Sequence, residues 1–330
     1  MSRSSILVTG GAGYIGSHTV LQLRARGEQV VVLDDLSTGF RQAVLDTPLV
    51  VGKVGDRDLV MEVLRTHGVD TVLHFAAHTI VPESVSNPLK YYGNNTCSTR
   101  NLLQCCVETG VSNVVFSSTA AVYGIPPESF AAETSPTAPI NAYGTSKLMS
   151  EWMLRDVAAS SALRYVALRY FNVAGSDTSG RIGQATAKAT LLVKVACEAA
   201  VGKRPYVSIY GTDFATDDGT GVRDYIHVED LATAHLDALT YLRKGGKPQV
   251  LNVGYGRGYS VREVLKSVER VAGLSLNIRE EARRPGDPPI LIARADRIRS
   301  ELGWSPKLDD LDTIVKTALK WEQRLTREPW

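Results

Sequence analysis

The chain has 330 residues, 44% of them apolar, which is enough to bury a large core in one big domain or two modest ones. Its 37 basic and 35 acidic side chains are spread along the sequence, so no basic block marks a nucleic-acid or membrane-surface partner. We find no apolar run as long as a membrane span, and we expect no signal peptide. These properties favour a small-molecule partner, with no nucleic acid and no membrane.

The four cysteines and the histidines lack the spacing of a zinc site, so we expect no metal. This cysteine usage fits a reducing cytoplasm best.

In the first half of the chain, short β-branched runs alternate with longer helical patterns. Strands are predicted at residues 5–10, 29–35, 71–77, 113–119 and 164–172. Helices are predicted at residues 14–27, 56–68 and 87–110 and after Tyr143. Repeated βαβ units of this kind predict an α/β fold with a Rossmann-type, doubly wound parallel sheet covered on both faces.

The alternation of strand and helix patterns ends after Asn172. Residues 175–184 and 211–221 are rich in Gly, Asp, Ser and Thr, which predicts loops. A helix at 228–246 and a strand at 249–254 suggest that the chain returns to the first domain. We therefore assign residues 1–171, with a return of 222–254, to a Rossmann domain. The remaining segments, 172–221 and 255–330, are assigned to a smaller mixed α/β substrate-binding domain that contains a closing amphipathic helix.

A glycine-rich segment, TGGAGYIG, lies between the first predicted strand and helix and contains Gly10, Gly13 and Gly16. Without side chains the backbone can turn sharply and approach a pyrophosphate, which then sits on the free N–H groups of the helix N-terminus. The alternative is a tight strand-to-helix turn with no ligand.

The second strand ends in LDD, about 20 residues beyond the glycines, where a carboxylate can accept hydrogen bonds from the adenosine ribose. A carboxylate also repels a 2′-phosphate, so Asp34, supported by Asp35, predicts NAD over NADP. The alternative is an acidic strand end in solvent.

Tyr143 and Lys147 are four residues apart, so on a helix both side chains lie on one face. An ammonium beside a phenol stabilises the phenolate and lowers its pKa, and a positively charged nicotinamide lowers it further, which would make Tyr143 a general base. Many helices carry such a pair by chance. Here, however, it follows a strand end with three consecutive hydroxyls, Ser117, Ser118 and Thr119.

The chain resembles the extended short-chain dehydrogenases/reductases. Their pattern is a glycine loop, an acidic strand end, a hydroxyl-bearing strand end and YxxxK, in this order. TGGAGYIGSH, SVSNPLKYYGNN, AYGTSKLMSE, LRYFNVAG and DGTGVRDYIHVEDLA resemble the UDP-glucose 4-epimerase family within it. The similarity runs over essentially the whole chain.

The resemblance implies three groups of site residues. The catalytic residues are Thr119, Tyr143 and Lys147. The cofactor contacts are Gly10, Gly13, Tyr14, Ile15, Gly16, Asp34, Asp35, Asp56, Phe75, Ala76, Ala77, Asn95, Tyr143, Lys147 and Tyr170. The substrate contacts are Thr119, Asn172, Leu191, Tyr210, Arg223, Arg284, Asp287 and Leu291. Arginine forks suit a diphosphate, although Arg223 and Arg284 can also be read as solvated surface residues.

The implied activity is NAD-dependent C4 epimerisation of a nucleotide sugar, UDP-glucose/UDP-galactose, through a transient 4-keto sugar. Alternatives are a UDP-pentose 4-epimerase, a nucleotide-sugar 4,6-dehydratase or decarboxylase, and a catalytically silent nucleotide sensor. Dehydratases carry an acidic pair after the strand-end Thr, where this chain has Ala120 and Ala121. A pure sensor has no use for a phenolate.

Two positions depart from the family pattern. Leu191 cannot offer the hydrogen bond of the Asn or His found in many members. Leu291 appears at a position that is Tyr in epimerases restricted to unacetylated sugars and small in those that accept N-acetylated ones, so we expect it to restrict N-acetylhexosamines. The resemblance also implies a homodimer, built through helices at residues 101–107 and 143–154.

Overall fold

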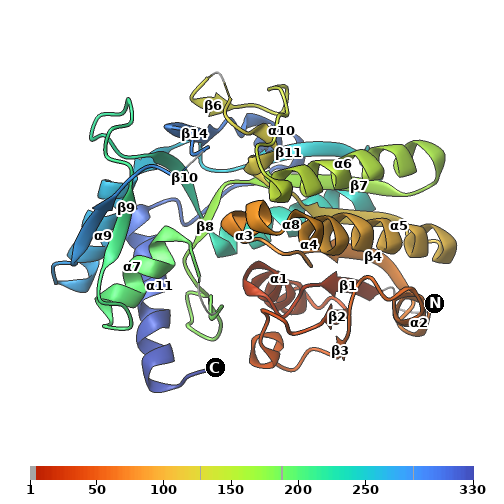
Figure 1. Ribbon diagram of the computed structural model, residues 1–330. Helices are drawn as coiled ribbons and strands as arrows, with labels where there is room; N and C mark the ends of the chain where they lie inside the picture. The colour runs from red at the N-terminus through yellow and green to blue at the C-terminus, as the bar shows by residue number, and fades with distance from the viewer. Residues whose placement is uncertain (1–4, 127, 187–188, 285) are drawn as a thin grey trace.

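The computed structural model describes residues 5–126, 128–186, 189–284 and 286–330. A seven-stranded sheet forms the larger part of the molecule (Figure 1), with the strand order β11-β7-β5-β4-β1-β2-β3. Every pairing in this sheet is parallel. The strands are β1 (Ser5–Thr9), β2 (Val30–Asp34), β3 (Leu49–Val51), β4 (Val69–His74), β5 (Asn113–Ser117), β7 (Arg164–Tyr170) and β11 (Gln249–Val253).

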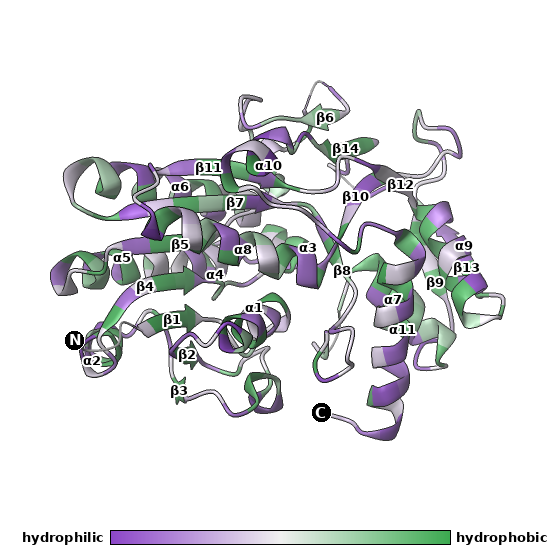
Figure 2. Cartoon of the chain, turned by 180° about the vertical axis from the view of Figure 1, so that it is seen from behind, coloured by the Kyte–Doolittle hydropathy of each residue, from purple (hydrophilic) through white to green (hydrophobic). Residues whose placement is uncertain are grey.

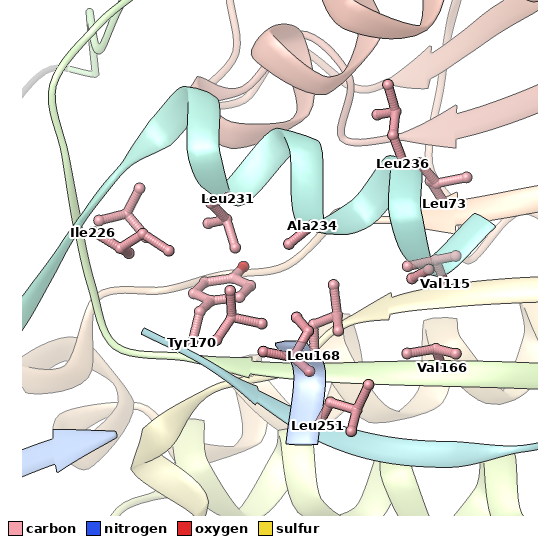
Figure 3. Close-up of a cluster of buried hydrophobic side chains, with 14 of the residues drawn as sticks. Leu73, Val115, Val166, Leu168, Tyr170, Ile226, Leu231, Ala234, Leu236 and Leu251 are labelled. Carbon is pink, nitrogen blue, oxygen red and sulfur yellow. The ribbon is translucent and has the colours of Figure 1, made fainter. Parts of the chain in front are cut away.

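Helices cover both faces of this sheet, which is why its strands read as near-continuous apolar runs. The helices are α1 (Tyr14–Ala25), α2 (Arg57–Thr66), α5 (Ser98–Thr109), α6 (Ala142–Ser160) and α8 (Val228–Arg243). One core lies under α1 and α8, and a second lies under α2, α5 and α6. Figure 3 shows Leu231 and Ala234 of α8 facing Leu168 and Tyr170 of β7 in the first of these cores. The predicted Rossmann-type fold is confirmed.

A second sheet has the strand order β12-β10-β14-β6, with β8 paired to β10. Its strands are β6 (Phe130–Ala131), β8 (Asn172–Ala174), β10 (Val222–His227), β12 (Gly258–Ser260) and β14 (Ile290–Ala293). A separate parallel pair is formed by β9 (Val207–Tyr210) and β13 (Ile278–Glu281). Strands this short carry little periodicity, and the sequence analysis did not locate them individually.

Helices α7 (Leu192–Ala200), α9 (Val261–Ala272) and α11 (Leu311–Arg327) surround a third core beside the second sheet. Figure 2 shows polar and apolar residues alternating along α11, and its buried face includes Ile314, Val315 and Ala318. None of the described helices is both long and apolar enough to cross a membrane.

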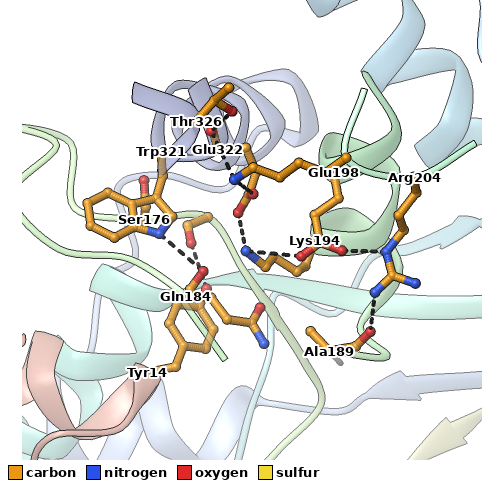
Figure 4. Close-up of polar contacts among 12 residues, drawn as sticks. Tyr14, Ser176, Gln184, Ala189, Lys194, Glu198, Arg204, Trp321, Glu322 and Thr326 are labelled. Carbon is orange, nitrogen blue, oxygen red and sulfur yellow. Dashed lines mark hydrogen bonds and ion pairs between the residues drawn. The ribbon is translucent and has the colours of Figure 1, made fainter. Parts of the chain in front are cut away.

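A cluster of buried charges joins α7 to α11 (Figure 4). Lys194 is bonded to Glu322 and lies 3.4 Å from Glu198. Lys203 lies 3.1 Å from Glu322, and Arg204 pairs with Glu198. Each buried charge in this cluster therefore faces an opposite one.

The short elements complete the chain: α3 (Val81–Ser86), α4 (Pro88–Tyr91), α10 (Asp296–Leu302), the 3₁₀ segments η1 (Arg41–Val44) and η3 (Ala120–Tyr123), and the π-helical η2 (Tyr92–Cys97). The single helix predicted over 87–110 is thus wrong in detail, because α4 passes through the π turn η2 before α5 begins. Gly93 and Asn94, both weak helix formers, lie in that turn.

The predicted return of residues 222–254 to the first domain also needs correction at its start. Residues 222–227 form β10, which pairs with β12, β14 and β8 of the second sheet. The return begins with α8 and is completed by β11, which pairs with β7. The short segment VRDYIH does not itself indicate which of the two sheets it joins.

Candidate active site

The glycine-rich loop between β1 and α1 is packed too tightly for side chains. Gly10 has a φ of +70°, and a Cβ there would lie 2.5 Å from the main-chain nitrogen of Ala76. A Cβ at Gly16 would lie 2.3 Å from the oxygen of Gly10. The loop therefore touches the chain leaving β4, at the switch point between β1 and β4, where doubly wound sheets bind their ligands.

Helix α1 starts behind this loop with main-chain N–H groups that are left for a ligand. Its N-cap, Gly13, makes no side-chain bond, and the first turn contains no acidic residue. Such a helix start binds an anion through its N–H groups and its partial positive charge. The loop and the uncapped helix fit the pyrophosphate of the predicted NAD. Ile15, in the same turn, is half-buried and packs against the core.

Asp34, at the end of β2, accepts hydrogen bonds from the glycine-rich loop and from the residues after β2, one with each carboxylate oxygen. Oδ2 accepts from the nitrogen of Ala12 at 2.9 Å, and Oδ1 accepts from that of Leu36 at 2.8 Å. Burial raises the pKa of the Asp34 carboxyl, and the two backbone bonds oppose this shift. The predicted bond to a ribose would use the lone pairs that these two backbone bonds leave. Asp35 accepts from the Ser37 amide at 3.0 Å.

The other predicted cofactor residues follow β3 and β4. Asp56 is exposed and N-caps α2, accepting from the Leu59 nitrogen at 3.2 Å. The nitrogen of Phe75 donates to the oxygen of Thr9 at 2.9 Å, which continues the ladder between β1 and β4. Ala76 and Ala77 come next, half-buried.

Asn95, in the π turn η2, joins this segment to α6. Its Oδ1 accepts from the nitrogen of His78 at 2.8 Å, and its Nδ2 donates to the His78 oxygen and to Ser146 Oγ, each at 3.0 Å. Asn95 is buried and its bonds cross from η2 to α6, so it holds the cofactor-side loop against the helix that carries Tyr143.

Thr119, Tyr143 and Lys147 come together between β5 and α6. Thr119 follows β5 and N-caps η3, where its Oγ1 accepts from the Ala121 nitrogen at 3.1 Å. A side-chain hydrogen bond with Thr119 acts on the Tyr143 phenol. Lys147 is buried, and its Nζ donates to the main-chain oxygen of Ser117 at 2.8 Å.

The predicted lowering of the Tyr143 pKa by Lys147 is not what the structure gives. Burial raises the pKa of the phenol, and the bond with Thr119 is the influence that lowers it. Burial also lowers the pKa of Lys147 to about 7, with Glu151 acting in the opposite direction. The prediction included the charge of the Lys147 ammonium. It did not include the loss of solvation that burial causes at both side chains.

Tyr14 and Tyr170, two further predicted cofactor residues, have hydroxyls bonded within the protein. Tyr14 donates to the oxygen of Gly175 at 2.7 Å, which connects the glycine loop to the segment after β8. The Tyr170 hydroxyl is bonded to Oγ of Ser117, the residue whose main-chain oxygen accepts from Lys147.

The sequence analysis overlooked Glu151 and Arg169 as site residues. Both are buried, and they form an ion pair with 2.5 Å between Glu151 Oε2 and Arg169 Nη2. Glu151 lies one turn beyond Lys147 on α6, within the quoted AYGTSKLMSE. The signal was present as a third polar residue at a four-residue spacing.

Three of the predicted substrate residues lie on adjacent strands of the second sheet. Arg223 of β10 is in register with Leu291 of β14, and β10 also pairs with β8, where Asn172 opposes Tyr225. Arg223 lies 3.9 Å from Asp287. Burial lowers the pKa of Arg223, and Asp287 opposes that shift.

The remaining predicted substrate residues lie outside these three strands. The exposed guanidinium of Arg284 stacks on the Tyr210 ring, 3.7 Å from its centroid. Gly286 approaches Ile140, because an added Cβ would lie 2.8 Å from Ile140 Cδ1, so this loop reaches the chain just before α6. Leu191 is the N-cap of α7 and makes no side-chain capping bond.

Comparison with known proteins agrees with this geometry. Residues 6–254 match the NAD dependent epimerase/dehydratase family. The chain belongs to this family. A UDP-glucose 4-epimerase of Azospirillum brasilense is 56% identical over 97% of this chain and 92% of its own length.

Solved structures show the same relationship. The UDP-glucose 4-epimerase of Brucella ovis, crystallised with NAD, is 44% identical with a TM-score of 0.93, covering 96% of this chain and 97% of that one. A UDP-Glc/GlcNAc 4-epimerase of Campylobacter jejuni is 47% identical with a TM-score of 0.86, covering 97% of this chain and 99% of that one.

Proposed function

We propose that this protein interconverts UDP-glucose and UDP-galactose by NAD-dependent epimerisation at C4 of the sugar. The observation that carries this proposal is the meeting of Thr119, Tyr143 and Lys147 at the sheet edge that also holds the glycine loop. The identities of 56% and 44% to two UDP-glucose 4-epimerases support it.

NAD is the cofactor that the residues fit, and when bound it supplies the reversible acceptance of a hydride from the sugar. The start of α1 and the loop around Gly10 hold its pyrophosphate. Asp34 and Asp35 accept from the adenosine ribose and disfavour a 2′-phosphate. Asp56, Phe75, Ala76, Ala77 and Asn95 line the rest of the cofactor.

In this proposal Tyr143 takes the proton of the 4-hydroxyl and later returns it, so it acts first as base and then as acid. Because burial raises the pKa of the phenol, its phenolate needs stabilisation, which the hydrogen bond with Thr119 supplies, while Lys147 on the next turn holds the end of β5 through Ser117. Thr119 bonds the phenol and the sugar oxygen, and so fixes the direction of proton transfer.

Arg223 and Arg284 grip the diphosphate, with Asp287 and Tyr210 orienting the two guanidinium groups. The nucleotide end is thereby held firmly, whereas the hexose, bordered by Asn172, Leu191 and Leu291, is held loosely enough to turn over. We assign cofactor binding to the seven-stranded sheet and its helices, and substrate binding to the second sheet with α7, α9 and α11.

The dehydratase alternative finds no acid–base pair after Thr119, because Ala120 is buried in η3 and Ala121 follows it there. Two methyl groups cannot move the protons that elimination of water requires.

We also propose a homodimer. Leu89 is 79% exposed, Trp152 47% and Val107 45%, and they lie on α4, α6 and α5, which pack side by side or through η2. A second copy that covers these apolar side chains would bury them. The buried free thiols of Cys105, Cys106 and Cys197 support a reducing, cytoplasmic location.

The test is to give the purified protein UDP-galactose without added NAD and to follow the sugar signals by proton NMR. Appearance of UDP-glucose supports both the reaction and a retained cofactor. Unchanged UDP-galactose in a sample shown to contain bound NAD would refute the proposed reaction.

A further inference from the structure

The buried pair of Glu151 and Arg169 is bonded as a fork. Arg169 Nε donates to Glu151 Oε1 at 2.9 Å, and Nη2 donates to Oε2 at 2.5 Å. The Arg169 side chain is only 7% exposed and that of Glu151 only 4%. Such a pair contributes little to stability compared with apolar residues of the same volume, so its use here calls for another reason.

Each partner of the pair also holds one end of the same short segment. Ser118 Oγ donates to Glu151 Oε1 at 2.5 Å, and Arg169 Nη1 donates to the Tyr123 hydroxyl at 3.1 Å. The guanidinium also lies 5.0 Å from the centre of the Tyr123 ring. Tyr123 in turn donates to Asn252 Oδ1 at 2.6 Å, which anchors this end to β11.

Thr119 lies between these two held ends. Ser118 precedes it directly, and the 3₁₀ segment η3, which Thr119 caps, ends at Tyr123. The segment is therefore fixed at both ends by a pair whose acidic partner is on α6, the helix that presents Tyr143 and Lys147. If α6 shifted relative to β5, the distance between Thr119 and the Tyr143 phenol would change. The Glu151–Arg169 pair prevents this because it makes residues 118–123 move together with α6.

We propose that Glu151 and Arg169 are positioning residues that clamp residues 118–123 to α6 and so set the geometry between Thr119 and the Tyr143 phenol. This inference rests on the proposed roles of Thr119 and Tyr143. It adds a function for four buried residues, Ser118, Tyr123, Glu151 and Arg169, to which the proposed function gives no role.

Removing one charge of a buried pair is strongly destabilising, so the test uses the two attachments instead. Ser118→Ala and Tyr123→Phe each release one end of the segment and leave the ion pair intact. We expect kcat to fall roughly 10-fold to 100-fold for each, since small misplacements of reacting groups have effects of this size. The KM for the UDP-sugar and the Kd for UDP should stay within twofold.

The chain offers a matched control for Ser118→Ala. Ser267 is also buried and donates to a carboxylate, Asp312 Oδ1, at 2.6 Å, and Asp312 is likewise held by an arginine, Arg270. This cluster lies between α9 and α11, away from α6. Ser267→Ala should therefore leave kcat unchanged, which would show that loss of a buried serine–carboxylate bond does not by itself lower kcat.

A cycle with Thr119→Ala separates the clamp from the proposed function. If the clamp acts through Thr119, Ser118→Ala should lower kcat in the wild-type background and have no further effect when Thr119 is already alanine. Equal effects in both backgrounds, or a kcat unchanged by Ser118→Ala and Tyr123→Phe, would overturn the clamp. A kcat unchanged by Thr119→Ala itself would instead overturn the proposed role of Thr119.

Discussion

Tyr143 and Lys147 lie one turn apart on α6, yet the hydrogen bond of the Lys147 ammonium goes to the main-chain oxygen of Ser117, 2.8 Å away. The lysine is thus tied to the end of β5, next to the segment that carries Thr119. The influence that lowers the pKa of the Tyr143 phenol comes instead from its hydrogen bond with Thr119.

This placement predicts an unusual dependence of stability on pH. Burial lowers the pKa of folded Lys147 from 10.5 to about 7. Between these values the unfolded chain binds a proton that the folded chain does not, so the free energy of unfolding should rise with pH, by up to roughly 1.4 kcal/mol per pH unit. The contribution is complete above pH 10.5 and is lost as the pH falls through 7.

Urea unfolding of the wild type and of Lys147→Met at pH 7, 8 and 9 would measure it. The wild type should gain stability relative to the variant as the pH rises. Parallel curves for the two proteins would contradict the lowered pKa.

The charge cluster between α7 and α11 predicts a large effect of a single substitution. Glu322→Ala removes the carboxylate that faces Lys194 and Lys203, and it should lower the free energy of unfolding by about 3 kcal/mol. Glu328→Ala is the control, because that carboxylate pairs with Arg324 at the surface and is 67% exposed. It should change stability by less than about 0.5 kcal/mol. If Glu322→Ala and Glu328→Ala lowered the free energy of unfolding in urea equally, the buried cluster would contribute no more to stability than a surface ion pair.

Leu291 predicts the choice between plain and N-acetylated sugars. It is half-buried on β14, opposite Arg223, and packs against the main core. UDP-galactose should therefore be turned over at least tenfold faster than UDP-N-acetylgalactosamine, and Leu291→Ser should narrow the difference by freeing volume. Comparable turnover of both sugars by the wild type would exclude this role.

The proposed dimer predicts that a charge on α6 separates the subunits. Trp152→Lys should give a monomer in size-exclusion chromatography with light scattering, because it would place an ammonium in an apolar interface. Leu274→Lys, at an apolar residue that is 38% exposed at the end of α9, should leave the mass unchanged. A monomeric wild type, or a Trp152→Lys dimer, would contradict the assigned face.

The Rossmann half of the fold was predictable where its strands are continuous apolar runs and its helices are long, but the three-residue edge strand β3, which is half-buried to exposed, was not predicted. VVVL of β2, for instance, is buried along its whole length. The second sheet was not predictable, because strands such as β6, with two residues, carry no period. Residues 222–227 were assigned to the first domain but form β10 of the second sheet, because the pairing of this strand depends on residues far along the chain.

The site divides in the same way. The spacing of Tyr143 and Lys147 on one helix face follows from the sequence alone. The direction of the Tyr143 pKa shift does not, because it depends on how much water the fold removes. The bonds of Glu151 to Ser118 and Arg169 connect three separate elements, α6, β7 and the end of β5, which no local pattern reveals.

Tyr143→Phe tests whether the Tyr143 phenol moves the proton of the sugar hydroxyl. The rate at which this variant epimerises UDP-galactose is measured, and its NAD content is determined in the same sample. NAD should be retained, and the rate should fall by a factor of roughly 10² to 10⁴. A variant that holds NAD and epimerises at the wild-type rate would contradict this role of the phenol.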